Sequence, residues 1–137
     1  RDMALVGAAG PLSNILLGFI GVVFFEFTWL LLPKTEFQST AYYIVFTAHT
    51  FFVLFANINV YLALFNLIPI PPLDGSRIFY VFLPPKAYFG IMKYEKYIMI
   101  VLIILMWAGV FSGTIGWLGD KVIDGMMRLV ELIPIFR

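Results

Sequence analysis

The sequence contains no cysteine and a single histidine, His49. The absence of cysteine excludes disulfide bonds, thiolate metal sites and cysteine nucleophiles. A zinc site takes three or four protein ligands, so His49 and one carboxylate do not complete one. We therefore expect His49 to be a packed or hydrogen-bonded residue. A serine-histidine-aspartate set would also require His49, and no glycine-rich phosphate loop is present.

The chain is also poor in charged residues, which make up 12% of its 137 residues. Soluble domains hold about 25% charged and about 45–50% apolar residues. Here 62% of the residues are hydrophobic and the mean hydropathy is +0.98. A core of this size cannot bury so much apolar surface, so the surrounding solvent must be lipid. Because the Lys and Arg residues form no basic stripe, we expect the lipid bilayer as a partner and no nucleic acid.

Three apolar segments are long enough to cross a bilayer, at residues 11–32, 42–68 and 97–118. Pro11 suits the first turn of the first helix. Gly109 and Gly113 form a small-xxx-small pair that predicts helix packing in the third segment. We expect an all-α membrane protein with about three transmembrane helices in a single domain, residues 1–137.

The C-terminal stretch differs from these segments because its apolar residues recur every three or four positions with charged residues between them. This spacing predicts an amphipathic helix that lies in the membrane interface, and packing on a partner domain is the alternative. The apolar stripe consists of Leu118, Val122, Met126, Val130 and Ile133.

The connector at residues 74–96 carries four basic residues and is expected to be a short amphipathic piece followed by an interfacial loop. The positive-inside rule places the Asp74 end of the protein toward the cytoplasm. The basic residues are Arg77, Lys86, Lys93 and Lys96.

Small and polar residues mark one face of each of the first two spans. Asn14, Gly18 and Gly21 share a face of the first span, and residues 7–10 open it with glycines, which predicts close packing. The second span carries a strip of small and amide side chains that must point at protein or water rather than lipid. This strip consists of Ala56, Asn59, Ala63 and Asn66.

The strip leads to a proline-broken turn and one carboxylate, Asp74, at the end of a stretch without fixed charge, residues 37–73. Pro69, Pro71 and Pro72 cannot all remain in a helix, because each lacks an N–H and clashes with the preceding turn. A carboxylate at mid-bilayer costs about 2.5–3.5 kcal/mol on insertion scales, so it usually has a partner. The pattern predicts a site at Asp74; the alternative is a helix-ending turn at the membrane surface with Asp74 solvated.

These residues also carry a family resemblance. Residues 66–75, Asn-Leu-Ile-Pro-Ile-Pro-Pro-Leu-Asp-Gly, resemble the Asn-x-x-Pro-x-Pro-x-x-Asp-Gly run of the site-2 protease family, the intramembrane zinc metallopeptidases of the M50 type. Residues 9–14, Ala-Gly-Pro-Leu-Ser-Asn, resemble the Ala-Gly-Pro-x-x-Asn segment of the same family. The two motifs lie in the family's order and cover the first two spans.

The resemblance implies that this chain is part of a zinc metallopeptidase that hydrolyses peptide bonds of membrane-embedded protein substrates. By position, Asp74 would be the third zinc ligand, and Asn66 would be a catalytic residue that contacts the substrate or the developing oxyanion. The implied cofactor is zinc, and the implied location is the cell membrane of a bacterium or archaeon. The unwound prolines would offer backbone groups to an extended substrate.

One departure from the family is decisive, because no His-Glu-x-x-His occurs in the sequence. His49 is followed by Thr50 and lies in the wrong helix, so two ligands and the general base are lacking. Either upstream core helices are missing, which the abrupt start at Arg1 favours, or the chain is a non-catalytic relative. We expect this polypeptide alone to bind zinc poorly and to cut nothing. The competing interpretation is a non-catalytic membrane scaffold, or an ion- or proton-conducting homologue with a path through Asp74, Asn59 and Asn66.

Overall fold

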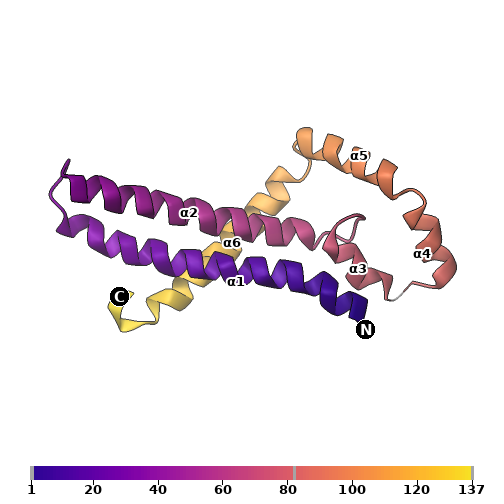
Figure 1. Ribbon diagram of the computed structural model, residues 1–137, viewed down its shortest axis with the longest axis horizontal. Coiled ribbons are helices and arrows are strands. Elements are labelled where there is room, and N and C mark those ends of the chain that lie inside the picture. The colour runs from indigo at the N-terminus through magenta and orange to yellow at the C-terminus, as the bar shows by residue number, and fades with distance from the viewer. Residues whose placement is uncertain (1, 82, 137) are drawn as a thin grey trace. The chain divides into compact units, whose positions relative to one another are not determined.

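The computed structural model describes residues 2–81 and 83–136, and all regular elements in this part of the chain are helical (Figure 1). In chain order they are α1 (Asp2–Leu31), η1 (Leu32–Lys34), α2 (Thr40–Asn66), α3 (Asp74–Tyr80), α4 (Pro85–Met92), α5 (Glu95–Trp107), α6 (Ser112–Glu131) and η2 (Pro134–Phe136). Two helical stretches, Leu5–Lys34 and Thr40–Asn66, are long and apolar enough to cross a membrane, and α5 with α6 would give a third span. The predicted all-α membrane fold is confirmed.

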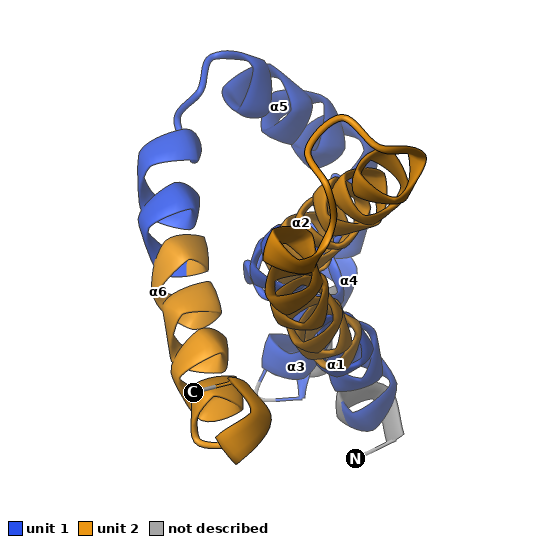
Figure 2. Cartoon of the chain, turned by 90° about the vertical axis from the view of Figure 1, so that its left-hand side faces the viewer, with its two compact units in different colours: residues 1–14, 61–118 blue, residues 15–60, 119–137 orange. Residues whose placement is uncertain are grey.

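The chain forms two compact units, each built from segments that lie far apart in the sequence (Figure 2). Unit 1 contains residues 1–14 and 61–118, and unit 2 contains residues 15–60 and 119–137. The prediction of a single domain stays a prediction.

In unit 2, α1 and α2 approach closely because glycines of α1 face small residues of α2. A Cβ on Gly21 would lie 3.0 Å from the Cα and Cβ atoms of Ala56, and one on Gly18 would lie 2.8 Å from Cγ2 of Val60. Val22, Ala56 and Val60 are fully buried in this contact region. The predicted packing role of Gly18 and Gly21 is therefore confirmed.

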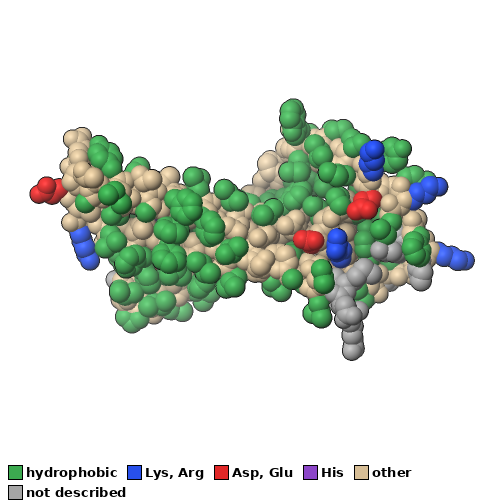
Figure 3. All heavy atoms as spheres, viewed as in Figure 1, with side chains coloured by type: hydrophobic (Ala, Val, Ile, Leu, Met, Phe, Trp, Pro, Cys, Tyr) green, Lys and Arg blue, Asp and Glu red, His purple; other side chains and the backbone are tan. Residues whose placement is uncertain are grey.

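Large hydrophobic side chains remain on the outside of the molecule. Phe24, Leu54 and Ile58 are among many that are between 46% and 62% exposed. On the face in Figure 3, hydrophobic side chains cover the paired stretches of α1 and α2. Contiguous apolar surface of this kind is expected when the neighbouring solvent is hydrocarbon rather than water.

Pro11 lies inside α1 rather than in its first turn, so the predicted helix start is wrong. A proline removes one intrahelical hydrogen bond. In a lipid environment an unpaired backbone N–H or C=O group costs several kcal/mol. The backbone groups on either side of Pro11 are therefore stabilised by the hydrogen bonds of a continued helix. Helix α1 therefore extends upstream through Gly7 and Gly10 to Asp2.

The third apolar segment, residues 97–118, is interrupted by a glycine cap, so it is not one continuous helix. Gly109 has φ +72°, its N–H donates to the Met106 carbonyl at 3.0 Å, and the Val110 N–H donates to the Leu105 carbonyl at 3.1 Å. These two bonds form a Schellman motif, which ends α5. Helices α5 and α6 are consequently bent by 78°. Nothing lies within 4 Å of a Cβ on Gly113, so the predicted packing of the Gly109–Gly113 pair is also wrong.

Helix α6 is amphipathic, as predicted, but its buried stripe is rotated relative to the expected one. Leu118 and Ile133 are 38% and 45% exposed, although both were expected in the stripe. The stripe within the described residues is Gly119, Ile123, Met126 and Val130. All four residues belong to unit 2, whose other segment comes from α1 and α2, so this stripe is covered by the chain itself.

Candidate metal centre

The chain leaves the helical conformation after Asn66, where α2 ends, as the three prolines predict. Two turn hydrogen bonds shape the break, from the Ile70 N–H to the Ile68 carbonyl at 2.8 Å and from the Leu73 N–H to the Ile70 carbonyl at 3.0 Å. The peptide bond between Pro71 and Pro72 is cis. The break delivers the chain to α3, whose first residue is Asp74.

The first residues of helix α3 are tightly packed. Leu73 has the extended conformation of an N-cap residue, and its carbonyl accepts a hydrogen bond from Oγ of Ser76 at 2.7 Å. Ser76 is only 2% exposed. Gly75 is also buried and lies against the carbonyl group of Leu67, just beyond α2. The start of α3 is thereby held against the end of α2.

The Asp74 side chain is half-buried and lies against α1 within unit 1. A Cβ on Gly10 would lie 2.6 Å from Oδ2 of Asp74, and a Cβ on Gly7 would lie 2.8 Å from the Asp74 carbonyl oxygen. The carboxylate thus occupies a notch that exists because α1 has no side chain there. This arrangement differs from a carboxylate that stands out in bulk water at a surface turn.

The amide-bearing strip of α2 faces protein, as predicted. Ala56 and Ala63 are fully buried and Asn59 is 9% exposed. The side-chain amide of Asn59 donates to the Phe55 carbonyl at 2.8 Å, so its own helix satisfies it. Asn66 is half-buried at the end of α2 and belongs to unit 1 together with Asp74.

His49 belongs to unit 2 and is engaged with α1 there. Its Nδ1 lies 3.0 Å from Oγ1 of Thr28 and 3.1 Å from the Phe25 carbonyl oxygen. Its ring also contacts those of Phe25 and Trp29, with centroids 6.0 and 5.6 Å apart. The expectation of a packed, hydrogen-bonded histidine is confirmed.

The described residues do not by themselves form a complete metal site. Residues 2–81 and 83–136 contain no cluster of three or more His, Cys, Asp or Glu side chains that could hold a metal ion. Asp74 offers the hard oxygen donor that zinc accepts, in a shaped notch, and therefore fits one corner of a zinc site rather than a whole one.

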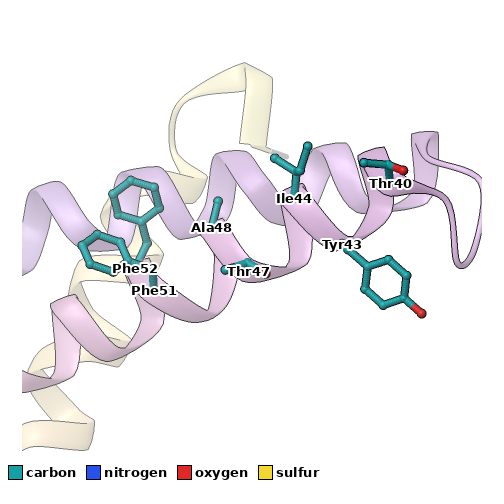
Figure 4. A pocket seen from close by; sticks show the side chains of 7 residues that line it. All are labelled: Thr40, Tyr43, Ile44, Thr47, Ala48, Phe51 and Phe52. Atoms are coloured by element: carbon teal, nitrogen blue, oxygen red, sulfur yellow. The ribbon is translucent and has the colours of Figure 1, made fainter.

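Two shallow grooves have linings that do not include Asp74. One, of about 730 Å³, runs along α2 between Thr40 and Phe52 and is lined by aliphatic, aromatic and hydroxyl side chains (Figure 4). The other, of about 310 Å³, lies between Ile70 of the proline break and α5, where Tyr97 and Val101 contribute to its wall. Neither lining contains a carboxylate or an imidazole, so neither is a metal centre.

Comparisons with known proteins agree with the two motifs. The sequence model of peptidase family M50 matches residues 1–109. Over 101 residues the chain is 37% identical to the Bacillus subtilis (strain 168) protein named "Putative zinc metalloprotease YwhC". The aligned region covers 74% of this chain and 44% of that protein. The chain therefore spans less than half the length of this relative. No solved structure matches the chain. By the extent of the family match, this chain is a member of peptidase family M50 and an integral membrane protein.

Proposed function

We propose that this chain is the part of a membrane zinc metallopeptidase that supplies its carboxylate ligand, Asp74. The observation that carries the proposal is the position of Asp74. Its carboxylate follows a broken, charge-free helix and rests in a notch of α1, and the family match covers both segments. A carboxylate kept near hydrocarbon needs a compensating partner, and a divalent cation is one.

The remaining ligands would come from outside this sequence. A catalytic zinc ion uses three protein ligands and leaves one position open for water or substrate. In this proposal Asp74 is one of these ligands, and the described residues contain no group of three or more ligating side chains that could complete the set. A histidine-bearing helix elsewhere in the full-length protein would supply the other two and the general base.

The roles of this chain's own residues follow from their positions. Zinc, when bound, supplies Lewis acidity and lowers the pKa of a water molecule. Asp74 would hold one corner of the centre on a rigid turn. The Asn66 amide, at the end of α2 in the same unit, would donate a hydrogen bond to the substrate carbonyl or to the oxyanion that develops from it.

A membrane-embedded polypeptide is the substrate class that suits this environment. The proline break leaves backbone groups outside regular helix, and such groups can pair with an extended chain. The adjoining groove between Ile70 and α5 is apolar and could take an apolar side chain of that substrate. The proposed location is a prokaryotic cell membrane, with the Asp74 end toward the cytoplasm.

The test uses the full-length protein purified in detergent or nanodiscs. Asp74→Asn removes the charge of the ligand while keeping its size, so we expect bound zinc and peptide cleavage to be lost together. Asp124→Asn is the matched control, because Asp124 is exposed on α6. Zinc content is measured by atomic absorption and cleavage on a model membrane substrate. Retention of zinc and cleavage in Asp74→Asn would remove Asp74 from the site and favour the scaffold or conducting homologue.

A further inference from the structure

Two glycines of α1, Gly7 and Gly10, have no room for a side chain because Asp74 and its neighbour Arg77 fill the space. A Cβ on Gly10 would lie 2.6 Å from Oδ2 of Asp74. A Cβ on Gly7 would lie 2.8 Å from the Asp74 carbonyl oxygen and 2.9 Å from Cβ of Arg77. Real Cβ contacts are essentially never closer than 3.0 Å. A methyl group at Gly7 would therefore press on the backbone at the start of α3, and one at Gly10 would push the Asp74 carboxylate out of its present position.

Among the described glycines of α1, Gly10 is the one whose Cβ position lies against a carboxylate. Gly18 and Gly21, further along α1, face α2 instead, at Val60 and Ala56. Gly75 of α3 lies against the Leu67 backbone, and four other helical glycines face open space, with nothing within 4 Å of their Cβ positions; these are Gly90, Gly113, Gly116 and Gly125. The bare backbone at Gly10 thus faces the carboxylate, while the bare backbone at Gly7 faces the start of the helix that carries it.

The contact also distinguishes the two oxygens of the carboxylate. Only Oδ2 and Cγ of Asp74 lie within 4 Å of the Gly10 Cβ position, at 2.6 and 3.5 Å, so Oδ1 is further away. Oδ2 therefore lies in the space that a side chain at position 10 would fill, and Oδ1 lies further from that space.

We propose that Gly7 and Gly10 are positioning residues, because their missing side chains leave the space in which the Asp74 carboxylate would be oriented toward the metal. The proposal rests on the function proposed above. Groups that orient a metal ligand without touching the metal typically change metal affinity by about 10- to 100-fold when they are altered. Gly10 acts on the carboxylate itself and Gly7 acts on the backbone that carries it, so Gly10 is expected to have the larger effect.

The test compares metal affinity in full-length variants by competition with a chelator, and records the visible absorption of cobalt-substituted protein. We expect Gly10→Ala to weaken zinc binding about 10- to 100-fold and to change the cobalt spectrum. Gly125→Ala, in open space, and Gly18→Ala, at the contact with α2, serve as controls that keep the affinity of the folded protein. Equal affinity in Gly10→Ala and wild type would overturn the proposal.

A double-mutant comparison separates positioning from general destabilisation. If Gly10 acts through Asp74, then Gly10→Ala lowers zinc affinity in the wild-type background and adds no further loss in the Asp74→Asn background. An equal loss in both backgrounds overturns the positioning role. If Asp74→Asn alone leaves zinc affinity unchanged, the proposed function fails instead. Should Gly10→Ala not fold, the zinc-loaded wild-type structure decides: an Asp74 that binds the metal from within the notch supports the proposal, and an Asp74 outside the notch contradicts it.

Discussion

A Cβ on Gly75 would lie 2.5 Å from both the carbonyl carbon and the carbonyl oxygen of Leu67. The residue after Asp74 must therefore be glycine for a steric reason, since the start of α3 is pressed onto the chain that leaves α2. Backbone atoms cannot move aside as a flexible side chain can. Together with Gly7 and Gly10, this glycine places Asp74 between α1 and the end of α2.

Gly75→Ala is expected to lower stability, because the added methyl group would overlap the Leu67 backbone. Overpacking of this kind typically destabilises by about 1–3 kcal/mol. Gly90→Ala, in α4 with nothing within 4 Å of its Cβ position, is the control and should be neutral or slightly stabilising. The measurement is the melting temperature of the protein in detergent. Equal melting temperatures for Gly75→Ala and wild type would show that the start of α3 is free to shift.

Asn66→Ala is expected to separate catalysis from metal binding in the full-length protein. If the Asn66 amide donates to the oxyanion, its removal should lower kcat by about 10²–10³-fold and leave zinc content unchanged. Asn57→Ala is a matched control on the same helix, since the Asn57 amide donates to the Val53 carbonyl at 2.8 Å. Loss of zinc in Asn66→Ala, or cleavage at the wild-type rate, would assign Asn66 a different role.

His49→Ala is expected to weaken the fold and to spare the metal. The substitution removes the contacts of Nδ1 with Thr28 and Phe25 and two ring contacts, which predicts a loss of about 1–3 kcal/mol. Thr50→Ala, beside it on α2, should change little because its exposed hydroxyl only bonds its own helix at Phe46. Melting temperature and zinc content are measured on the same preparations. A zinc-free His49→Ala protein with normal stability would make His49 a ligand after all.

Gly109→Ala is expected to destabilise the bend between α5 and α6, because Gly109 adopts φ +72°. A side chain in this left-handed conformation costs roughly 1–2 kcal/mol. Gly113→Ala, nearby and open, is the control. Thermal unfolding of both variants checks the prediction, and an unchanged midpoint in Gly109→Ala would mean that the Schellman motif is not needed to end α5.

Local sequence rules predicted much of the architecture. Apolar runs of sufficient length identified α1 and α2, since span length is set by bilayer thickness. The prolines identified the break before Asp74, since each removes an N–H donor wherever it stands. The 3.6-residue period also identified the protected face of α2, including Ala56 and Asn59.

The errors arose where the structure depends on a contact with a distant segment or on the backbone conformation of a single residue. The sequence does not distinguish a glycine that packs against a helix from one that, like Gly109, adopts the left-handed conformation that ends a helix. The stripe of α6 was predicted correctly at Met126 and Val130 and wrongly elsewhere. Several apolar side chains compete for the buried face, and only the segments that α6 contacts select Ile123 over Val122. Glycines 7 and 10 were recognised as packing residues, but their partner could not be named.

The sequence alone, through its composition and short-range geometry, determined three properties. The chain is embedded in lipid, its second span breaks at the prolines, and one carboxylate follows the break. The first two properties come from solvent preference and backbone sterics, which each residue carries with it, and the third is read directly from the order of the residues. Only the tertiary structure decided that Asp74 meets the bare backbone of Gly10, and that His49 meets Thr28 instead of a metal. Such contacts depend on which segments the chain brings together across dozens of residues, and no local rule encodes that choice.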